Sequence, residues 1–261
     1  MAARADKIGF FAGFKHLFTG LHFAYGRQHR ELAAFYLPPM LFGILVLVIG
    51  WIIFAQIVDD IISLVWSAPE AWYLYALWKI LSILLWIICA AGTALIAVIC
   101  MVIAAAPISD FISERVEGIL GTWTPRPFSV RFLLRDLGST VLLELRRALI
   151  KLAWLVPLFL ASLFIPVVGQ IAYIVVGGYI LAKYLGMDYV DWSLARRGYS
   201  WRERFAFAKA HRAALLGFGT AVILALFVPF GFIAVWPGAV AGGTILCIRL
   251  GPEDKRGSQR D

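Results

Sequence analysis

The residues best suited to chemistry form one short polar segment between two apolar stretches, Gly26-Arg27-Gln28-His29-Arg30. An arginine guanidinium offers planar, forked donors that match the oxygens of a tetrahedral oxyanion. A glycine turn lets backbone N–H groups approach an anion, and donors at the start of a following helix add to the attraction. The segment therefore predicts an oxyanion site made by Gly26, Arg27, Arg30 and His29. Contact with lipid phosphates is the alternative, since basic clusters beside a membrane commonly bind anionic head groups.

Three carboxylates suggest a second kind of chemistry, because Asp110, Glu114 and Glu117 follow one another at helical spacing. Such a group can serve as acid and base or bind a metal. No histidine accompanies it, however, and favourable electrostatics at the start of a helix beginning at Pro107 explains acidic residues without chemistry.

No other catalytic feature is visible in the sequence. We find no nucleophile–base pair, phosphate-binding loop or cofactor motif. The histidines have no metal-like arrangement; they are His16, His22, His29 and His211. We therefore predict that the chain is not an enzyme and uses neither a cofactor nor a metal.

A second arginine-rich segment, residues 196–212, is accompanied by aromatic side chains: Trp192, Tyr199, Trp201 and Phe205. Basic and aromatic residues together are typical of anchoring at a membrane surface. Electrostatic collection of anions toward a pore is the alternative.

Composition sets the environment in which these residues must work. The chain has 261 residues, of which 62% are hydrophobic and 15% are charged, with a mean hydropathy of +0.84. Soluble domains carry about 25% charged residues, so this chain is an integral membrane protein. Its net charge of +8 reflects basic membrane-flanking loops rather than nucleic-acid binding, because no reader motif is present. The odd number of cysteines predicts no disulfide framework; they are Cys89, Cys100 and Cys247.

The hydrophobic pattern predicts an all-α, polytopic membrane protein. Uncharged runs over 32–58 and 72–106 are long enough for two transmembrane helices, the second interrupted only by Lys79. Amphipathic patterns over 7–25, 107–120 and 129–151 predict interfacial helices. We expect a single membrane domain, 1–261, divided into a cytoplasmic or interfacial N-terminal helix (1–31), two spanning helices (32–106), cytoplasmic amphipathic helices (107–151), a hairpin (152–187), a basic cytoplasmic segment (188–213), a second hairpin (214–249) and a polar tail (250–261).

The two hairpins look alike in sequence. Each has an apolar approach, a proline, an uncharged turn and a return helix with a glycine pair, Gly177-Gly178 in the first and Gly242-Gly243 in the second. The glycine pairs predict close helix contacts, either within the subunit or between subunits. Short arms and uncharged turns favour re-entrant hairpins that enter the bilayer partway, and short spanning hairpins are the alternative.

Basic residues are distributed asymmetrically. Five lie in residues 1–31, seven in 107–151 and seven in 183–213, whereas residues 59–71 contain none. The positive-inside rule then places both termini and both basic regions in the cytoplasm.

Three stretches carry a family resemblance: IAAAPISDFISERVEGILG (103–121), the run from Lys183 to Gly219, and WPGAVAGGTIL (236–246). In order and spacing they resemble the CysZ family of bacterial sulfate permeases and the wider family of etoposide-induced membrane proteins. The resemblance implies an inner-membrane homo-oligomer that imports sulfate for cysteine synthesis. It also implies an anion site before the first spanning helix, where the family has a Gly-Leu-Arg-Arg turn and this chain has Gly26 to Arg30.

The expected partners are therefore sulfate or a related oxyanion and anionic lipid head groups. A membrane protein of the same fold that organises lipids or partner proteins without transporting anything is the alternative.

Overall fold

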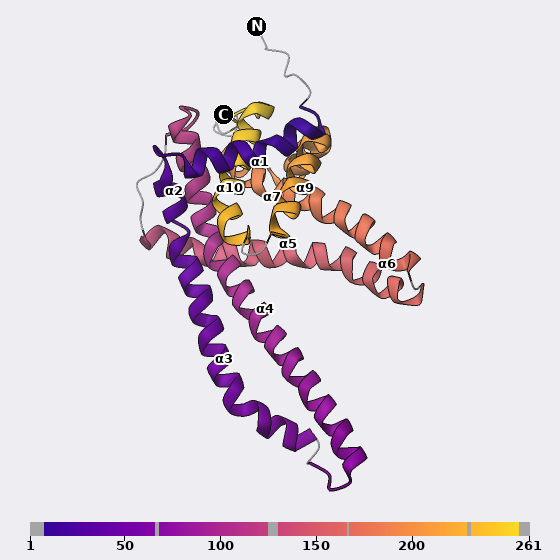
Figure 1. The fold of residues 1–261 in the computed structure, drawn as a ribbon. Coiled ribbons are helices and arrows are strands. Elements are labelled where there is room, and N and C mark those ends of the chain that lie inside the picture. Colours follow the sequence, from indigo (N-terminus) through magenta and orange to yellow (C-terminus); the bar gives the residue numbers. More distant parts are fainter. Residues whose placement is uncertain (1–7, 66–67, 125–129, 166, 229–230, 256–261) are drawn as a thin grey trace. The chain divides into compact units, whose positions relative to one another are not determined.

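In the computed structural model the described residues are 8–65, 68–124, 130–165, 167–228 and 231–255, and their regular elements are all helical. The helices are α1 (Phe10–Tyr25), α2 (Arg30–Ala34), α3 (Leu37–Val65), α4 (Trp72–Ile119), α5 (Val130–Phe164), α6 (Val168–Ala172), a π-helical turn (Tyr173–Gly177), α7 (Gly178–Arg196), α8 (Trp201–Ala210), α9 (Arg212–Leu226) and α10 (Gly231–Leu250) (Figure 1). The predicted all-α class is confirmed.

The chain divides into two compact units. One comprises residues 37–105, and the other comprises residues 1–36 together with 106–261. The prediction of a single membrane domain with seven segments stays a prediction.

In the 37–105 unit, α3 and the first part of α4 form an antiparallel pair. A β-carbon on Gly43 would lie 2.8 Å from Met101, and one on Gly50 would lie 2.8 Å from Thr93. Further along, Phe54, Val58 and Ile62 form a small core against partly buried hydrophobic residues of α4 (Trp78, Leu85, Trp86 and Cys89). Glycines at one end and aromatic rings at the other thus set the spacing of the pair.

The outer surface of this pair is apolar. Ile52 is 53% exposed and Ile80 is 63% exposed. Exposing apolar side chains to water is unfavourable in free energy, whereas contact with lipid tails is not. Among the described residues, three helices are long and apolar enough to cross a membrane: Glu31–Leu64, Trp72–Ile119 and Val168–Arg196. The chain is a multi-pass membrane protein, as predicted. The re-entrant placement of the two hairpins stays a prediction.

One prediction about α4 is wrong. Pro107 lies inside a continuous helix of 48 residues and does not begin a new one. A proline removes one backbone hydrogen bond, and membrane helices tolerate this loss where neighbouring groups compensate. The division between the two units falls at this point, because the second unit resumes at Ala106. Residues 107–119 are therefore the end of α4 and not a separate helix, and Ile112 and Val116 are fully buried.

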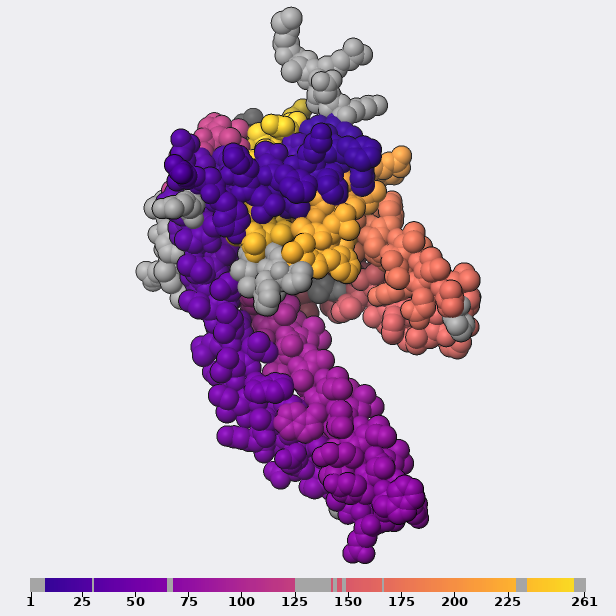
Figure 2. Space-filling model, viewed as in Figure 1, coloured from indigo at the N-terminus to yellow at the C-terminus, as the bar shows by residue number. Residues whose placement is uncertain are grey.

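In the second unit, α1 packs across α9 and α10 (Figures 1 and 2). Its buried face consists of small residues and two larger ones: Gly13, His16, Leu17, Gly20 and Ala24. A β-carbon on Gly20 would lie 2.1 Å from the carbonyl oxygen of Gly238, so the backbones of α1 and α10 touch. Two aromatic side chains of α1 lie outside this contact, with Phe11 79% exposed and Phe18 58% exposed.

The two hairpins differ more than their sequences suggest. The first pairs α5 with α6, the π-helical turn and the beginning of α7, and the second joins α9 to α10. A β-carbon on Gly243 would lie 2.6 Å from the Cβ of Tyr189, whereas one on Gly178 would meet nothing within 4 Å. The expected close helix contact within the chain is confirmed for Gly242 and Gly243, and for Gly178 the contact between subunits stays a prediction.

The predicted basic segment, 188–213, is mostly helical. α7 continues through it to Arg196, and a capping box formed by Ser200 and Glu203 begins α8. α8 and α9 then meet at an angle of 90°. This bend brings the basic end of α8 beside the start of α9.

Candidate functional site

The predicted anion site is a turn between α1 and α2. The backbone N–H of His29 donates to the carbonyl of Gly26 at 2.9 Å, which closes the turn. The imidazole of His29 stacks on the ring of Phe23, with the ring centroids 4.6 Å apart. The structure therefore brings Gly26, Arg27 and His29 together, while the side chain of Arg30 lies outside the described part of the structure.

Arg27 is the residue of this turn best placed to meet a solute. Its side chain is exposed, and no carboxylate in the described ranges pairs with it. Within the same ranges, the backbone N–H groups of Arg27 and Gln28 donate no turn or loop hydrogen bond to a backbone carbonyl. A free guanidinium next to two free N–H groups suits an oxyanion with several acceptor oxygens.

Tyrosines hold the chain on both sides of the turn. The hydroxyl of Tyr25 donates to the carbonyl of Ala234 in α10 at 2.8 Å, and burial raises the pKa of this phenol, so it stays a donor. After the turn, the hydroxyl of Tyr36 lies 2.7 Å from Ser109 Oγ. Leu32, between them, is buried. The turn is thus fixed to α10 and to the end of α4.

A second polar site, which the sequence did not reveal, lies inside this unit. Ser109, Ser113 and Glu117 are spaced four residues apart along α4 and are all fully buried. Each makes hydrogen bonds to other helices, so we name these three residues and their partners the polar ladder. At its first rung Ser109 contacts Tyr36 and accepts from Trp236 Nε1 at 3.2 Å.

The second and third rungs join α4 to α7 and α10. Ser113 Oγ accepts from Thr244 Oγ1 at 2.8 Å and from Arg196 at 2.6 Å. Glu117 accepts from Arg197 at 2.7 Å and from the hydroxyl of Ser193. Arg196 also pairs with Asp110 and lies 3.5 Å from Glu117.

These pairs correct the interpretation of the acidic residues as helix-start groups. Glu117 lies in the last turn of α4, where the helix dipole disfavours a negative charge. Arg196 and Arg197 offset this cost and neutralise the carboxylate. The signal in the sequence was the four-residue spacing of Ser109, Ser113 and Glu117, which places them on one helix face. Predicting their partners requires the fold, since Arg197 is 80 residues away.

Charge balance distinguishes the two sites chemically. In the ladder, Asp110 and Glu117 balance Arg196 and Arg197, so an additional anion would meet no net positive charge. At the turn, Arg27 has no such partner among the described residues. The ladder stabilises the packing of α4, α7 and α10, and the anion site at the turn stays a prediction.

Comparison with known proteins identifies relatives over most of the chain. Residues 17–237 match the family described as Sulfate transporter CysZ/Etoposide-induced protein 2.4. A protein of Pseudomonas aeruginosa (strain LESB58) named Sulfate transporter CysZ is 31% identical over 231 residues, which cover 84% of this chain and 88% of that protein.

A second relative with the same name, from Pseudomonas fluorescens (strain Pf-5), is 36% identical over 151 residues. That match covers 56% of this chain and 59% of the relative's own length. Both relatives are named as transporters and not as enzymes, in agreement with the sequence-based prediction.

Proposed function

Because this chain belongs to the Sulfate transporter CysZ/Etoposide-induced protein 2.4 family, we propose that it carries sulfate, or a similar small oxyanion, across a bacterial inner membrane. The observation that carries this proposal is the match to a named sulfate transporter over 84% of the chain. Within the described ranges, three helices able to cross a membrane and an exposed Arg27 that pairs with no carboxylate support it. The imported sulfate would serve cysteine synthesis.

The proposed anion site is the turn of Gly26, Arg27, His29 and Arg30. Sulfate has four oxygens that accept hydrogen bonds, and the turn offers a guanidinium and backbone N–H groups as donors. The fixed positions of Tyr25 and Tyr36 reduce the entropy that the turn would lose on binding.

In the proposed orientation both termini and the basic segment 183–213 face the cytoplasm, as the distribution of Lys and Arg predicts. A cysteine introduced at the exposed Arg202 tests this, after Cys89, Cys100 and Cys247 are replaced by serine. An impermeant maleimide should label it in inside-out vesicles and not in intact cells. Labelling in intact cells would refute the orientation.

Growth on limiting sulfate tests the proposed function. A bacterial strain lacking its own sulfate uptake should grow when this chain is expressed, and added cysteine should abolish the difference between strains with and without it. Failure to restore growth, with the protein present in the membrane at normal levels, would favour the alternative of a membrane-organising protein.

A further inference from the structure

A pocket between α7, α8 and α9 is separate from both the turn and the polar ladder. It has a volume of about 700 Å³ and is also bordered by Phe10 of α1. We name it the α7–α9 pocket. This volume lies within the range of about 300–1,000 Å³ found for sites of small organic ligands.

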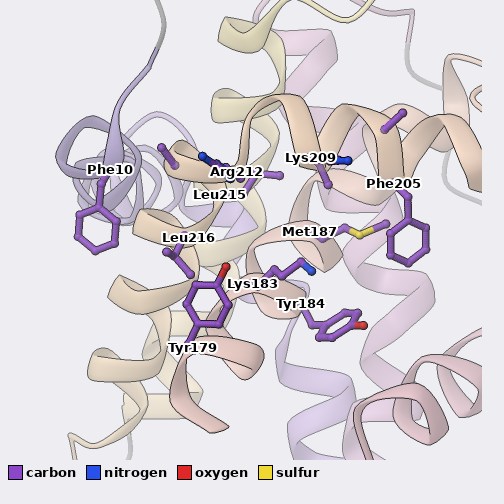
Figure 3. Close-up of a pocket in the computed structure, with 13 residues that line it drawn as sticks. Phe10, Tyr179, Lys183, Tyr184, Met187, Phe205, Lys209, Arg212, Leu215 and Leu216 are labelled. Atoms are coloured by element: carbon purple, nitrogen blue, oxygen red, sulfur yellow. The ribbon is translucent and has the colours of Figure 1, made fainter. Parts of the chain in front are cut away.

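Three cations line the pocket. Lys183 comes from α7, Lys209 from α8 and Arg212 from the start of α9. In Figure 3, Lys209 and Arg212 lie at the upper edge and Lys183 lies below them. All three side chains are exposed, and none of the described residues that line the pocket is acidic.

The nearby carboxylates do not neutralise these cations. Asp188 pairs with Lys151, and Asp191 pairs with Arg204 at 3.0 Å. In the described part of the chain, no carboxylate pairs with Lys183, Lys209 or Arg212. The pocket therefore has a net positive charge and lacks an anion of its own.

The remaining walls are apolar or aromatic. Rings of Phe10, Tyr184 and Phe205 surround the space, with Leu216 of α9 among them (Figure 3). A soluble anion such as sulfate would bring no apolar surface to cover these groups. A ligand with an anionic head and a hydrocarbon tail would match both kinds of wall.

An apolar path leads away from the cations along α6, the π-helical turn and the start of α7. Ile171 of α6, Val175 of the π-helical turn and Tyr179 of α7 precede Lys183 in the chain, and they are 58%, 64% and 54% exposed. This part of the chain is one of the candidate membrane spans. Hydrocarbon on this stripe would place a phosphate near Lys183, at the end of the apolar surface.

We propose that the α7–α9 pocket binds an anionic phospholipid, with its phosphate at Lys183, Lys209 and Arg212 and an acyl chain along the apolar surface of α6, the π-helical turn and the start of α7. The site lies apart from the proposed sulfate site and does not depend on transport. Phosphatidylglycerol is the probe, and phosphatidylcholine, which has a similar size and no net charge, is its matched comparison.

Native mass spectrometry of the full chain, purified in detergent and titrated with either lipid, tests the proposal. We expect phosphatidylglycerol to bind in preference to phosphatidylcholine. The triple variant Lys183→Gln/Lys209→Gln/Arg212→Gln should bind it about a hundredfold more weakly, given the contribution of each basic residue near an anionic lipid.

The matched control removes three exposed cations elsewhere, Lys15→Gln/Lys79→Gln/Arg202→Gln. It should bind phosphatidylglycerol like the unaltered chain. Equal losses in the two triple variants would overturn the proposal, because they would show that only the total charge matters.

A second variant keeps all the charges and fills the space. Ala213→Trp, at an exposed position in the pocket wall, should weaken phosphatidylglycerol binding at least tenfold. This variant decides the outcome if the triple variant fails to fold, and unchanged binding would then overturn the proposal.

A competition experiment distinguishes a lipid from a soluble anion as the ligand. Dioctanoyl phosphatidylglycerol should displace the bound lipid, whereas glycerol 3-phosphate and sulfate should not. Displacement by either soluble anion at the same concentration would also overturn the proposal.

Discussion

At the scale of single residues, the decisive contrast is between arginines that are paired and buried and an arginine that is exposed and free. Arg197 is buried against Glu117, and removing either partner leaves a charge in an apolar interior. Such a loss costs about 3–5 kcal/mol. Arg27 has no partner among the described residues, so its removal should affect binding and not folding.

Glu117→Ala should therefore be among the most destabilising single substitutions. We expect the free energy of unfolding to fall by about 3–5 kcal/mol, because Arg197 would stay buried without its carboxylate. Thermal unfolding in detergent measures the change, with Glu70→Ala, at an exposed loop position, as the control. The double variant Glu117→Leu/Arg197→Met should recover much of the loss. A Glu117→Ala protein as stable as the control would contradict a structural role for the ladder.

Arg27→Ala should weaken sulfate binding by about 10- to 100-fold, because one charge-assisted contact contributes about 1.5–3 kcal/mol. The double variant Arg27→Ala/Arg30→Ala should abolish binding. Isothermal titration of sulfate into the purified protein measures both, and Lys15→Ala, an exposed cation of α1, is the control. Unchanged affinity in the double variant would exclude the turn as the anion site.

His16 should make the packing of α1 sensitive to pH. Its Nδ1–H donates to the carbonyl of Ala12 at 2.6 Å, and its Nε2 accepts from Arg249 of α10 at 3.4 Å. Burial, followed by the charge of Arg249, lowers the pKa of the imidazole below its ordinary value of about 6.5. The unfolded chain then binds the proton more readily, so this contribution to stability is present above about pH 6.5 and is lost as the pH falls below it.

Unfolding measured between pH 7.5 and pH 5.5 tests this expectation. His16→Gln should reduce the loss of stability on acidification, whereas His22→Gln, at an exposed position of the same helix, should leave it unchanged. Identical pH profiles for the two variants would contradict the role of His16.

At the scale of helices, close contacts depend on a few glycines. Gly243→Ala should destabilise the protein by about 1–3 kcal/mol, because the added methyl group would lie 2.6 Å from the Cβ of Tyr189 and force α10 away from α7. Gly178→Ala meets no neighbouring atom and should stabilise the helix by about 0.5–1 kcal/mol. Thermal unfolding of the two variants compares them directly. Equal changes in the free energy of unfolding for Gly243→Ala and Gly178→Ala would contradict this difference between the two glycines.

The helices themselves were predictable to different degrees. The uncharged runs that became α3 and the first part of α4 have no alternative to the helix in lipid, because every backbone group must be satisfied internally. The continuation of α4 through Pro107 was missed, since a local rule for proline ignores what neighbouring helices provide. The different surroundings of Gly178 and Gly243 within the chain could not be predicted either, because only the fold decides which glycine faces another helix of the same chain.

The functional residues follow the same division. The turn at Gly26 to Arg30 could be proposed from the sequence because its residues are adjacent there. The ladder could not, because Glu117 and Arg197 become neighbours only when α4 and α7 pack together.

At the scale of the whole molecule, a multi-pass membrane protein carries an exposed cationic turn fixed by hydrogen bonds to the ends of α4 and α10. Paired charges and closely packed small residues hold the helices of the interior together. Arg27 takes part in none of these described contacts, so its side chain is available to a solute. The proposed passage of sulfate is thus separated from the interactions that maintain the fold.

Uptake of radiolabelled sulfate by proteoliposomes containing the purified chain tests this proposal most directly. Vesicles with the chain should accumulate sulfate faster than empty vesicles, and the Arg27→Ala/Arg30→Ala variant, reconstituted at equal density, should lose most of that uptake. Uptake no faster than in empty vesicles, with the protein shown to be folded and inserted, would contradict transport and leave a membrane-organising role.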